Sequence, residues 1–174
     1  MGIPFPPPAE LVGRFHETVQ IVDSLLRNET TTYAGKYYQL KDAYVRPEPI
    51  QRPRPPITIA AHRPRMLGIT ARYADRWNSY GTAAEMRARN QILDEQCGGI
   101  GRDPDEISRS LYGWASLMAV DPWDSVGAFH DMVGQYREAG INEFLIDQPR
   151  PEQFPVLERV AAELIPALRS GKAG

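Results

Sequence analysis

The chain of 174 residues is long enough for one domain with a hydrophobic core and too short for two ordinary domains. Its composition, 42% apolar and 24% charged with a formal net charge of −2, is typical of a globular protein and lacks the basic excess that binds nucleic acid or an anionic membrane. A single cysteine excludes a disulfide framework, and no signal-peptide pattern or long apolar run is present, so we expect a cytoplasmic protein without a membrane span.

The first third of the chain predicts one amphipathic helix followed by an extended excursion. Residues 8–28 carry apolar side chains at steps of three and four, which is the spacing of one helix face. The segment TTYAGKYYQL, with β-branched and aromatic residues around Gly35, predicts a small hairpin or an extended segment. The stretch from Pro47 to Pro56 holds five prolines and cannot be helical. We interpret residues 29–56 as an excursion and Pro-rich connector within a single domain of residues 1–174.

After the connector, strand and helix patterns alternate. Strands are predicted at 56–61, 75–81, 107–120 and 142–147, and helices at 64–74, 83–97, 124–140 and 152–171. In the third of these helices Asp124 is the expected N-cap and Gly140 the stop. The alternation favours an α/β fold with a parallel sheet, either an open doubly wound sheet or part of a closed barrel, which usually takes about 250 residues.

Basic residues follow the first of these strands in the segment TIAAHRPRM. Ligands of α/β folds bind beyond the carboxyl ends of the strands, where Ala61, His62 and Arg63 lie. The helix starting at Pro64 would direct free N–H groups to the same place, and Arg65 could add a bidentate contact. The segment therefore predicts a cradle for an anion such as a cofactor phosphate, although the arginines could equally be solvated surface residues.

Other strand ends offer weaker candidates. Trp77 and Asn78 end the second strand, and Trp114 lies in the third. Either tryptophan could wall a flat ring system or pack in the core, and for Trp114 we favour core packing. Asp147 is the one acidic candidate for a site residue at the end of the last strand, and it could equally be a cap for the following helix. We expect surface or packing roles for the helical His16 and His130. With no metal-ligand cluster, no G-x-S-x-G motif and no acid–base dyad, we predict no metal site and assign no catalytic residue.

Several of these segments together resemble the bacterial luciferase-like flavin and deazaflavin oxidoreductases. The resemblance rests on an R-x-x-E helix core, a Y-A-G-K-Y-Y-Q-L segment, a Pro-rich connector and A-D-R-W-N, at 14–17, 33–40, 47–56 and 74–78. It implies a (β/α)₈ barrel whose loop after the first strand here binds the phosphate of FMN or of the deazaflavin coenzyme F420. The resemblance implies that Ala61, His62 and Arg65 contact the cofactor, and Trp77 and Asn78 are further candidates. Arg63 is adjacent, where many relatives have glycine, and its side chain could add a phosphate contact or obstruct the approach.

The resemblance also bears on the short length. The resemblance matches the chain to the last four βα units of such a barrel, the C-terminal half of a TIM barrel, with one preceding helix. A truncated gene product, a mis-set start and a true half-barrel would each account for this. Exposed sheet edges would favour a homodimer or higher oligomer. The implied function is an oxidoreductase or monooxygenase acting on a small-molecule substrate, with this chain supplying the cofactor-phosphate side. The alternatives are a non-catalytic half-barrel module that self-associates and, less favoured, an open-sheet protein that binds another phosphorylated molecule.

Overall fold

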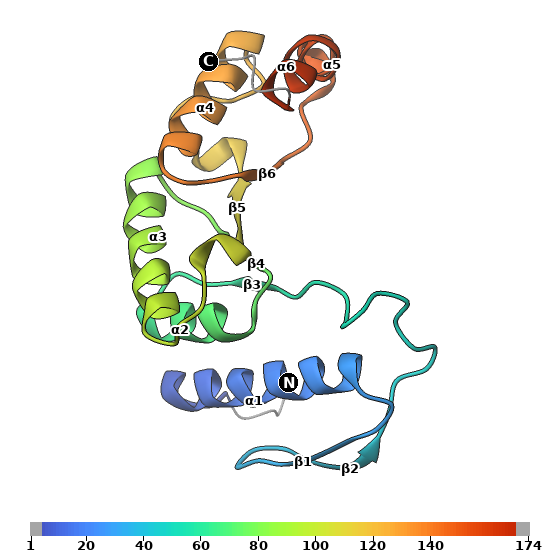
Figure 1. The fold of residues 1–174 in the computed structure, drawn as a ribbon. Helices are drawn as coiled ribbons and strands as arrows, with labels where there is room; N and C mark the ends of the chain where they lie inside the picture. Colours follow the sequence, from blue (N-terminus) through green and yellow to red (C-terminus); the bar gives the residue numbers. More distant parts are fainter. Residues whose placement is uncertain (1–4, 170–174) are drawn as a thin grey trace. The chain divides into compact units, whose positions relative to one another are not determined.

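The structure, a computed structural model, describes residues 5–169 (Figure 1). The helices are α1 (Pro8–Arg27), α2 (Pro64–Tyr73), α3 (Ala83–Gly98), α4 (Val126–Glu138), α5 (Phe154–Arg159) and α6 (Ile165–Arg169). The strands are β1 (Thr31–Ala34), β2 (Gln39–Ala43), β3 (Thr58–Ala60), β4 (Arg76–Ser79), β5 (Ser108–Gly113) and β6 (Glu143–Ile146). Two compact units result, Met1–Arg76 with Leu93–Ile107, and Trp77–Ile92 with Ser108–Gly174. None of the described helices is long and apolar enough to cross a membrane.

In the first unit, one carboxylate fixes the predicted hairpin to the predicted helix α1. β1 and β2 pair antiparallel, and α1 lies beside them (Figure 1). Glu17 of α1 accepts hydrogen bonds from the backbone N–H groups of Lys36, Tyr37 and Tyr38 at 2.8, 2.9 and 3.0 Å. Burial would raise the pKa of Glu17, but these three donors outweigh it and hold the pKa below its usual value. A Cβ at Gly35 would lie 2.3 Å from Glu17 Oε2, so this turn requires glycine.

The Pro-rich connector contains no helix or strand, as predicted, and a buried arginine anchors its end. The Arg54 side chain is only 5% exposed and forms ion pairs with Asp23 of α1 and with Asp75. It also donates to the Tyr73 carbonyl at 3.2 Å, and Asp75 accepts from the Ile57 N–H at 2.7 Å. The connector therefore enters β3 from a fixed position against α1 and the end of α2.

The α/β alternation predicted from the sequence is confirmed. Strands β3, β4, β5 and β6 follow one another in one sheet in chain order. β5 and β6 pair parallel, with a register running from Ser110↔Glu143 to Gly113↔Ile146. Adjacent parallel strands joined through helices are the repeating unit of barrels and doubly wound sheets.

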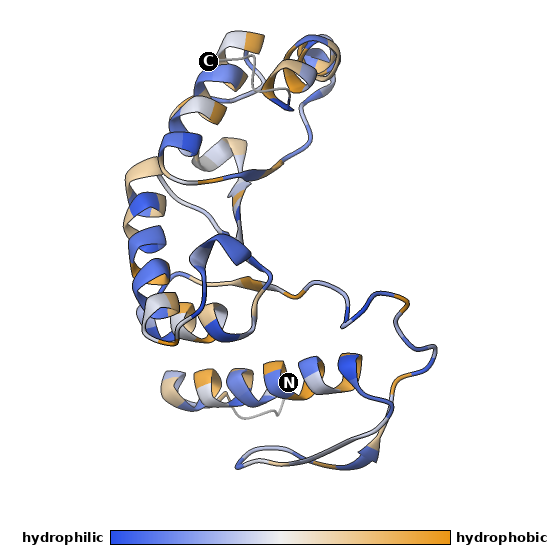
Figure 2. Cartoon of the chain, in the orientation of Figure 1, coloured by the Kyte–Doolittle hydropathy of each residue, from blue (hydrophilic) through white to orange (hydrophobic). Residues whose placement is uncertain are grey.

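In the second unit, α4 contributes one apolar stripe, which also confirms its prediction. Phe129, Val133 and Tyr136 are buried on this stripe, and the ring of Phe129 lies 5.0 Å from that of Trp123. Hydrophobic and hydrophilic residues alternate along the helices, as Figure 2 shows. The Trp123 indole N–H donates to the Asp147 carbonyl at 2.7 Å, so the segment before α4 is fastened to the end of β6.

Two details of the second unit were predicted wrongly. The third strand ends at Gly113 rather than at residue 120, because its parallel partner β6 ends at Ile146 and the ladder stops there. The N-cap of α4 is Ser125, whose Oγ accepts from the Ala128 N–H at 3.0 Å. Asp124 lies one residue too early to reach the third N–H of the helix.

The last predicted helix, 152–171, is present but interrupted. A π-helical turn at Val160–Leu164 separates α5 from α6, and the Ile165 N–H donates to the Val160 carbonyl five residues back. The next residue, Pro166, has no N–H and cannot continue the ordinary ladder. Residues 170 and 171 of the prediction lie outside the described residues.

Candidate functional site

The predicted anion cradle lies in the first unit, between β3 and α2. Ala61 is buried directly after β3, His62 is half-buried, and Arg63 is exposed. Arg63 is the N-cap of α2 with extended backbone angles (φ −111°, ψ 149°), and its side chain makes no capping hydrogen bond. The sequence therefore placed these residues correctly at the carboxyl end of a strand and the start of a helix.

The start of α2 leaves backbone donors available. Pro64 occupies the first helical position, and the first intrahelical hydrogen bond runs from the Leu67 N–H to the Arg63 carbonyl at 2.9 Å. The N–H groups of Arg65 and Met66 precede this bond and have no carbonyl within the helix to accept them. Two backbone donors and the positive end of the helix dipole thus meet at one point.

The charges at this helix start are opposite to those that stabilise a helix. The first turn of α2 has no acidic residue, and its basic residue, Arg65, lies next to the exposed N-cap Arg63. A cation at this end is unfavourable by about 0.3–1 kcal/mol, because it repels the positive end of the dipole. Within residues 5–169, neither guanidinium has a hydrogen-bond or ion-pair partner, in contrast to the doubly paired Arg54. A bound anion would relieve this repulsion and could accept bidentate hydrogen bonds from either arginine.

The other two predicted contacts belong to the second unit. Trp77 is completely buried, which favours core packing over a role as a wall for a ring. The Asn78 side-chain amide donates to Ser110 Oγ at 3.0 Å. Their assignment as cofactor contacts remains a prediction, and only the residues from Ala61 to Arg65 form one local cluster.

Trp114 does not pack in the core. The assignment was wrong because β5 ends at Gly113, which makes Trp114 the first residue beyond the strand; it is 39% exposed. Its ring lies 4.9 Å from that of Tyr112 and 5.7 Å from that of Tyr80, which directly follows β4. These three aromatic residues, here called the aromatic cluster, were missed as a group. The signal that could have revealed them is an aromatic residue directly after each of two strand ends.

The remaining candidates have structural surroundings. The Asp147 N–H donates to the Gly113 carbonyl at 3.1 Å, and the Tyr112 hydroxyl lies 3.5 Å from its carboxylate. His16 Nε2 lies 3.2 Å from the Tyr73 hydroxyl in the first unit. His130 is half-exposed beside the exposed Asp131. Both histidines thus have the packing and surface environments expected of them.

Comparison with known proteins relates the chain to one family and to one fold. The sequence profile of the family described as luciferase-like monooxygenase matches residues 1–121. A phthiodiolone/phenolphthiodiolone dimycocerosates ketoreductase of Mycobacterium kansasii is 29% identical over 168 residues, covering 82% of this chain and 45% of the relative. An F420-dependent glucose-6-phosphate dehydrogenase of Beutenbergia cavernae is 23% identical over 223 residues, covering 98% of this chain and 65% of the relative.

Among solved structures, an F420-dependent secondary alcohol dehydrogenase in complex with an F420-acetone adduct superposes with a TM-score of 0.80 at 16% identity. The match covers 95% of this chain and 64% of that one. This likeness shows the shared fold. The chain spans less than two thirds of the length of each of these three proteins.

Proposed function

The chain belongs to the luciferase-like monooxygenase family, and from that premise we propose that it forms the cofactor-phosphate side of a flavin- or deazaflavin-dependent oxidoreductase. We infer F420 as one candidate cofactor because similar proteins are named as F420-dependent enzymes, and FMN as the other because of the sequence resemblance to flavin-dependent members of the family. Both cofactors carry a phosphate, which is the group that the start of α2 is equipped to bind.

The residues present fit such a phosphate. The observation that carries the proposal is the pair Arg63 and Arg65, which have no hydrogen-bond or ion-pair partner among the described residues, at a helix start without an acidic residue. The N–H groups of Arg65 and Met66, which have no acceptor within the helix, add directed donors. The exposed Arg63 adds a second cation at this point, which supports phosphate binding on charge grounds.

The roles of the cofactor and of the protein follow from the general chemistry of flavin-type cofactors. Bound FMN or F420 would supply the redox chemistry, while the protein contributes binding, orientation and electrostatics. We assign Arg65 and Arg63 to holding the phosphate and assign no residue of this chain to proton transfer. The substrate is a small molecule, and residues outside this chain complete the active site of the whole barrel.

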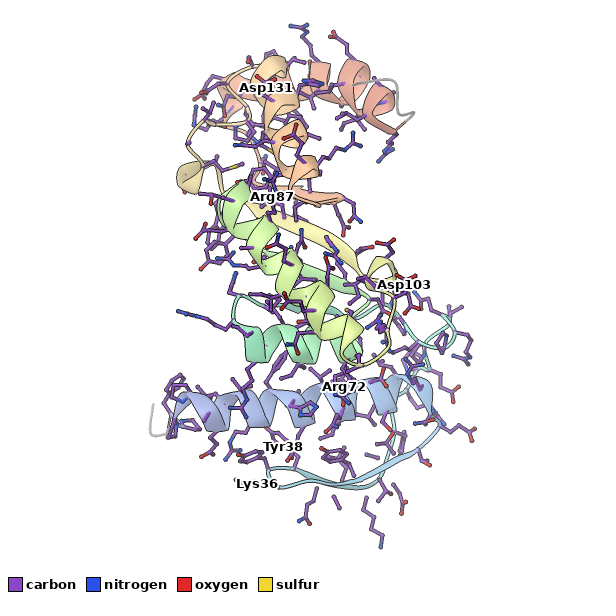
Figure 3. The ribbon with its side chains drawn as sticks, turned by 60° about the vertical axis from the view of Figure 1, so that its left-hand side comes forward. Lys36, Tyr38, Arg72, Arg87, Asp103 and Asp131 are labelled. Atoms are coloured by element: carbon purple, nitrogen blue, oxygen red, sulfur yellow. The ribbon has the colours of Figure 1, made fainter. Side chains whose placement is uncertain are left out.

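A titration of the purified chain with FMN and with F420 tests this proposal. Replacing Arg65 with alanine should weaken binding about tenfold or more, because a charge-assisted hydrogen bond contributes about 1.5–3 kcal/mol. The matched control is Arg72→Ala, which removes an exposed arginine from the last turn of the same helix (Figure 3). Arg72→Ala should bind like the unmodified chain. Equal loss in both variants, or no effect of Arg65→Ala, would contradict a phosphate cradle at the start of α2.

A second candidate function, a self-associating half-barrel without turnover, is favoured by the end of the sheet. Among the described strands β6 pairs with β5 alone, and Leu145 of β6 is 45% exposed. An open edge with apolar side chains promotes pairing with another chain. We propose a homodimer or higher oligomer on this basis. Light scattering of the purified chain decides the point, and a monomer at micromolar concentration would contradict it.

A further inference from the structure

The second unit contains two neighbouring cavities that the cofactor-phosphate site does not use. Their volumes are about 520 and 200 Å³, and they share Thr82, Met118 and Tyr136 in their walls. The smaller cavity is lined by the aromatic cluster of Tyr80, Tyr112 and Trp114 at the ends of β4 and β5. The larger one extends along α4. The shared residues make the two cavities direct neighbours, here treated together as one pocket, and the larger alone has room for a small organic molecule.

No basic side chain lines this pocket in the described part of the chain, and two acidic side chains, Glu85 and Asp131, lie in its wall. Glu85 accepts from the Thr82 N–H at 2.8 Å and from its hydroxyl at 3.1 Å, and Arg89 lies 3.7 Å from the other carboxylate oxygen. The Asp131 side chain, on α4 (Figure 3), is 87% exposed and lies 3.6 Å from His130 Nδ1. The pocket thus offers no cation to an anionic ligand, and the Asp131 carboxylate, whose neighbour His130 is charged only when protonated, would repel one.

The polar groups of the wall are mostly satisfied within the protein. The Tyr136 hydroxyl donates to the Gly81 carbonyl at 2.8 Å. The Thr82 hydroxyl donates to the Glu85 carboxylate and accepts from the Glu85 N–H at the start of α3. Apart from the Gln135 amide and the Asp131 carboxylate in the larger cavity, the wall that a ligand would meet is aromatic and aliphatic, with the rings of the aromatic cluster beside Met118. A group that needed hydrogen bonds or a counter-ion would lose its water here without compensation.

We propose that this pocket binds an uncharged, largely apolar molecule that carries a ring, and that it rejects phosphorylated or carboxylated molecules. A ring would stack on the exposed face of Trp114, and the aliphatic remainder would lie along α4. Identifying this molecule as the substrate of the reaction rests on the oxidoreductase function proposed above. The pocket itself lies within the second unit and depends on neither the cradle nor the cofactor.

Two fluorescent probes that share a ring system test the class of ligand. N-phenyl-1-naphthylamine is neutral, and 8-anilino-1-naphthalenesulfonate adds a sulfonate to the same rings. The full chain should bind the neutral probe at one saturable site and the sulfonate at least about tenfold more weakly. Comparable affinity for both probes, or no saturable binding of the neutral one, would overturn the proposal.

Variants locate the binding within the pocket. Trp114→Ala should weaken the neutral probe about fivefold, because it removes one stacking surface. The control Tyr44→Ala removes an aromatic residue that is 64% exposed outside the pocket and should leave affinity unchanged. Met118→Lys places a cation in the shared wall and should shift the preference toward the sulfonate. Equal affinities for Trp114→Ala and Tyr44→Ala, or an unchanged preference in Met118→Lys, would refute the location. Since no cofactor is present in this assay, failure here is distinct from failure of the FMN and F420 titration.

Discussion

Arg54 is predicted to hold the first unit together, and the replacement Arg54→Met tests this. Methionine retains much of the aliphatic stem but removes the guanidinium, which pairs with Asp23 and Asp75 and donates to the Tyr73 carbonyl. Removing one partner of a fully buried ion pair costs about 3–5 kcal/mol. Here the carboxylates of Asp23 and Asp75 are 22% and 40% exposed, so water can solvate them after the change. We therefore expect a smaller loss of about 2–3 kcal/mol in the free energy of unfolding.

Urea denaturation followed by circular dichroism measures this loss. The matched control is Arg52→Met, since the Arg52 side chain is 67% exposed and lies 3.8 Å from Glu48, a surface pair worth less than about 0.5 kcal/mol. Equal effects of the two replacements would refute the argument that the buried network anchors the connector.

The same network predicts a pH dependence. Burial alone would raise the pKa of Asp75, but the hydrogen bonds from Arg54 and from the Ile57 N–H outweigh it and lower the pKa. A lowered pKa contributes stability that is complete above the carboxyl's unfolded value of about 3.9 and is lost as the pH falls below it. The difference in unfolding free energy between Arg54→Met and the unmodified chain should therefore shrink below about pH 4. A difference that stays constant down to pH 3 would contradict this.

Two further predictions concern α4 and its ends. Gly140 has φ +88°, and an added Cβ would lie 2.9 Å from Asn90 Nδ2, so Gly140→Ala should lower the free energy of unfolding by about 1–2 kcal/mol. Gly134 lies in open space within the helix, so Gly134→Ala should raise the free energy of unfolding by about 0.5–1 kcal/mol. Urea denaturation that ranks the two variants in the opposite order would contradict the turn assignment at Gly140. Ser125→Ala should lower the free energy of unfolding by about 1 kcal/mol, and Asp124→Ala should lower it by less than about 0.5 kcal/mol. A larger effect of Asp124→Ala would identify Asp124 as the N-cap instead of Ser125.

The order of helices and strands could be predicted because local patterns specify it. The spacing of apolar residues marked α1 and α4, Pro64 marked the start of α2, and the run of prolines marked the connector. The position of the proposed cradle followed from the same patterns, since a strand end and a helix start fall together at residues 61–65, whereas its role in binding stays a prediction. For these features the neighbouring sequence determines the structure.

Features that depend on partners distant in the sequence could not be predicted. β5 ends at Gly113 because its parallel pairing with β6 ends there, at Ile146. The sequence between Gly113 and Val120 contains no glycine, proline, asparagine or aspartate that would mark this boundary. The mistaken end placed Trp114 within a strand and therefore in the core. Trp77 and Trp114 look alike as strand residues, yet one is fully buried and the other exposed. The pairing of Arg54 with two aspartates likewise depends on tertiary contacts, which single-sequence patterns do not contain.

The comparison of FMN with riboflavin tests the central claim most directly, because the two molecules differ only by the phosphate. If the start of α2 binds that phosphate, the chain should bind FMN at least about tenfold more tightly than riboflavin, and Arg65→Ala should abolish most of this preference while leaving riboflavin binding unchanged. An Arg65→Ala variant that weakens both ligands equally, or a chain that binds riboflavin as tightly as FMN, would contradict a phosphate cradle at Arg65.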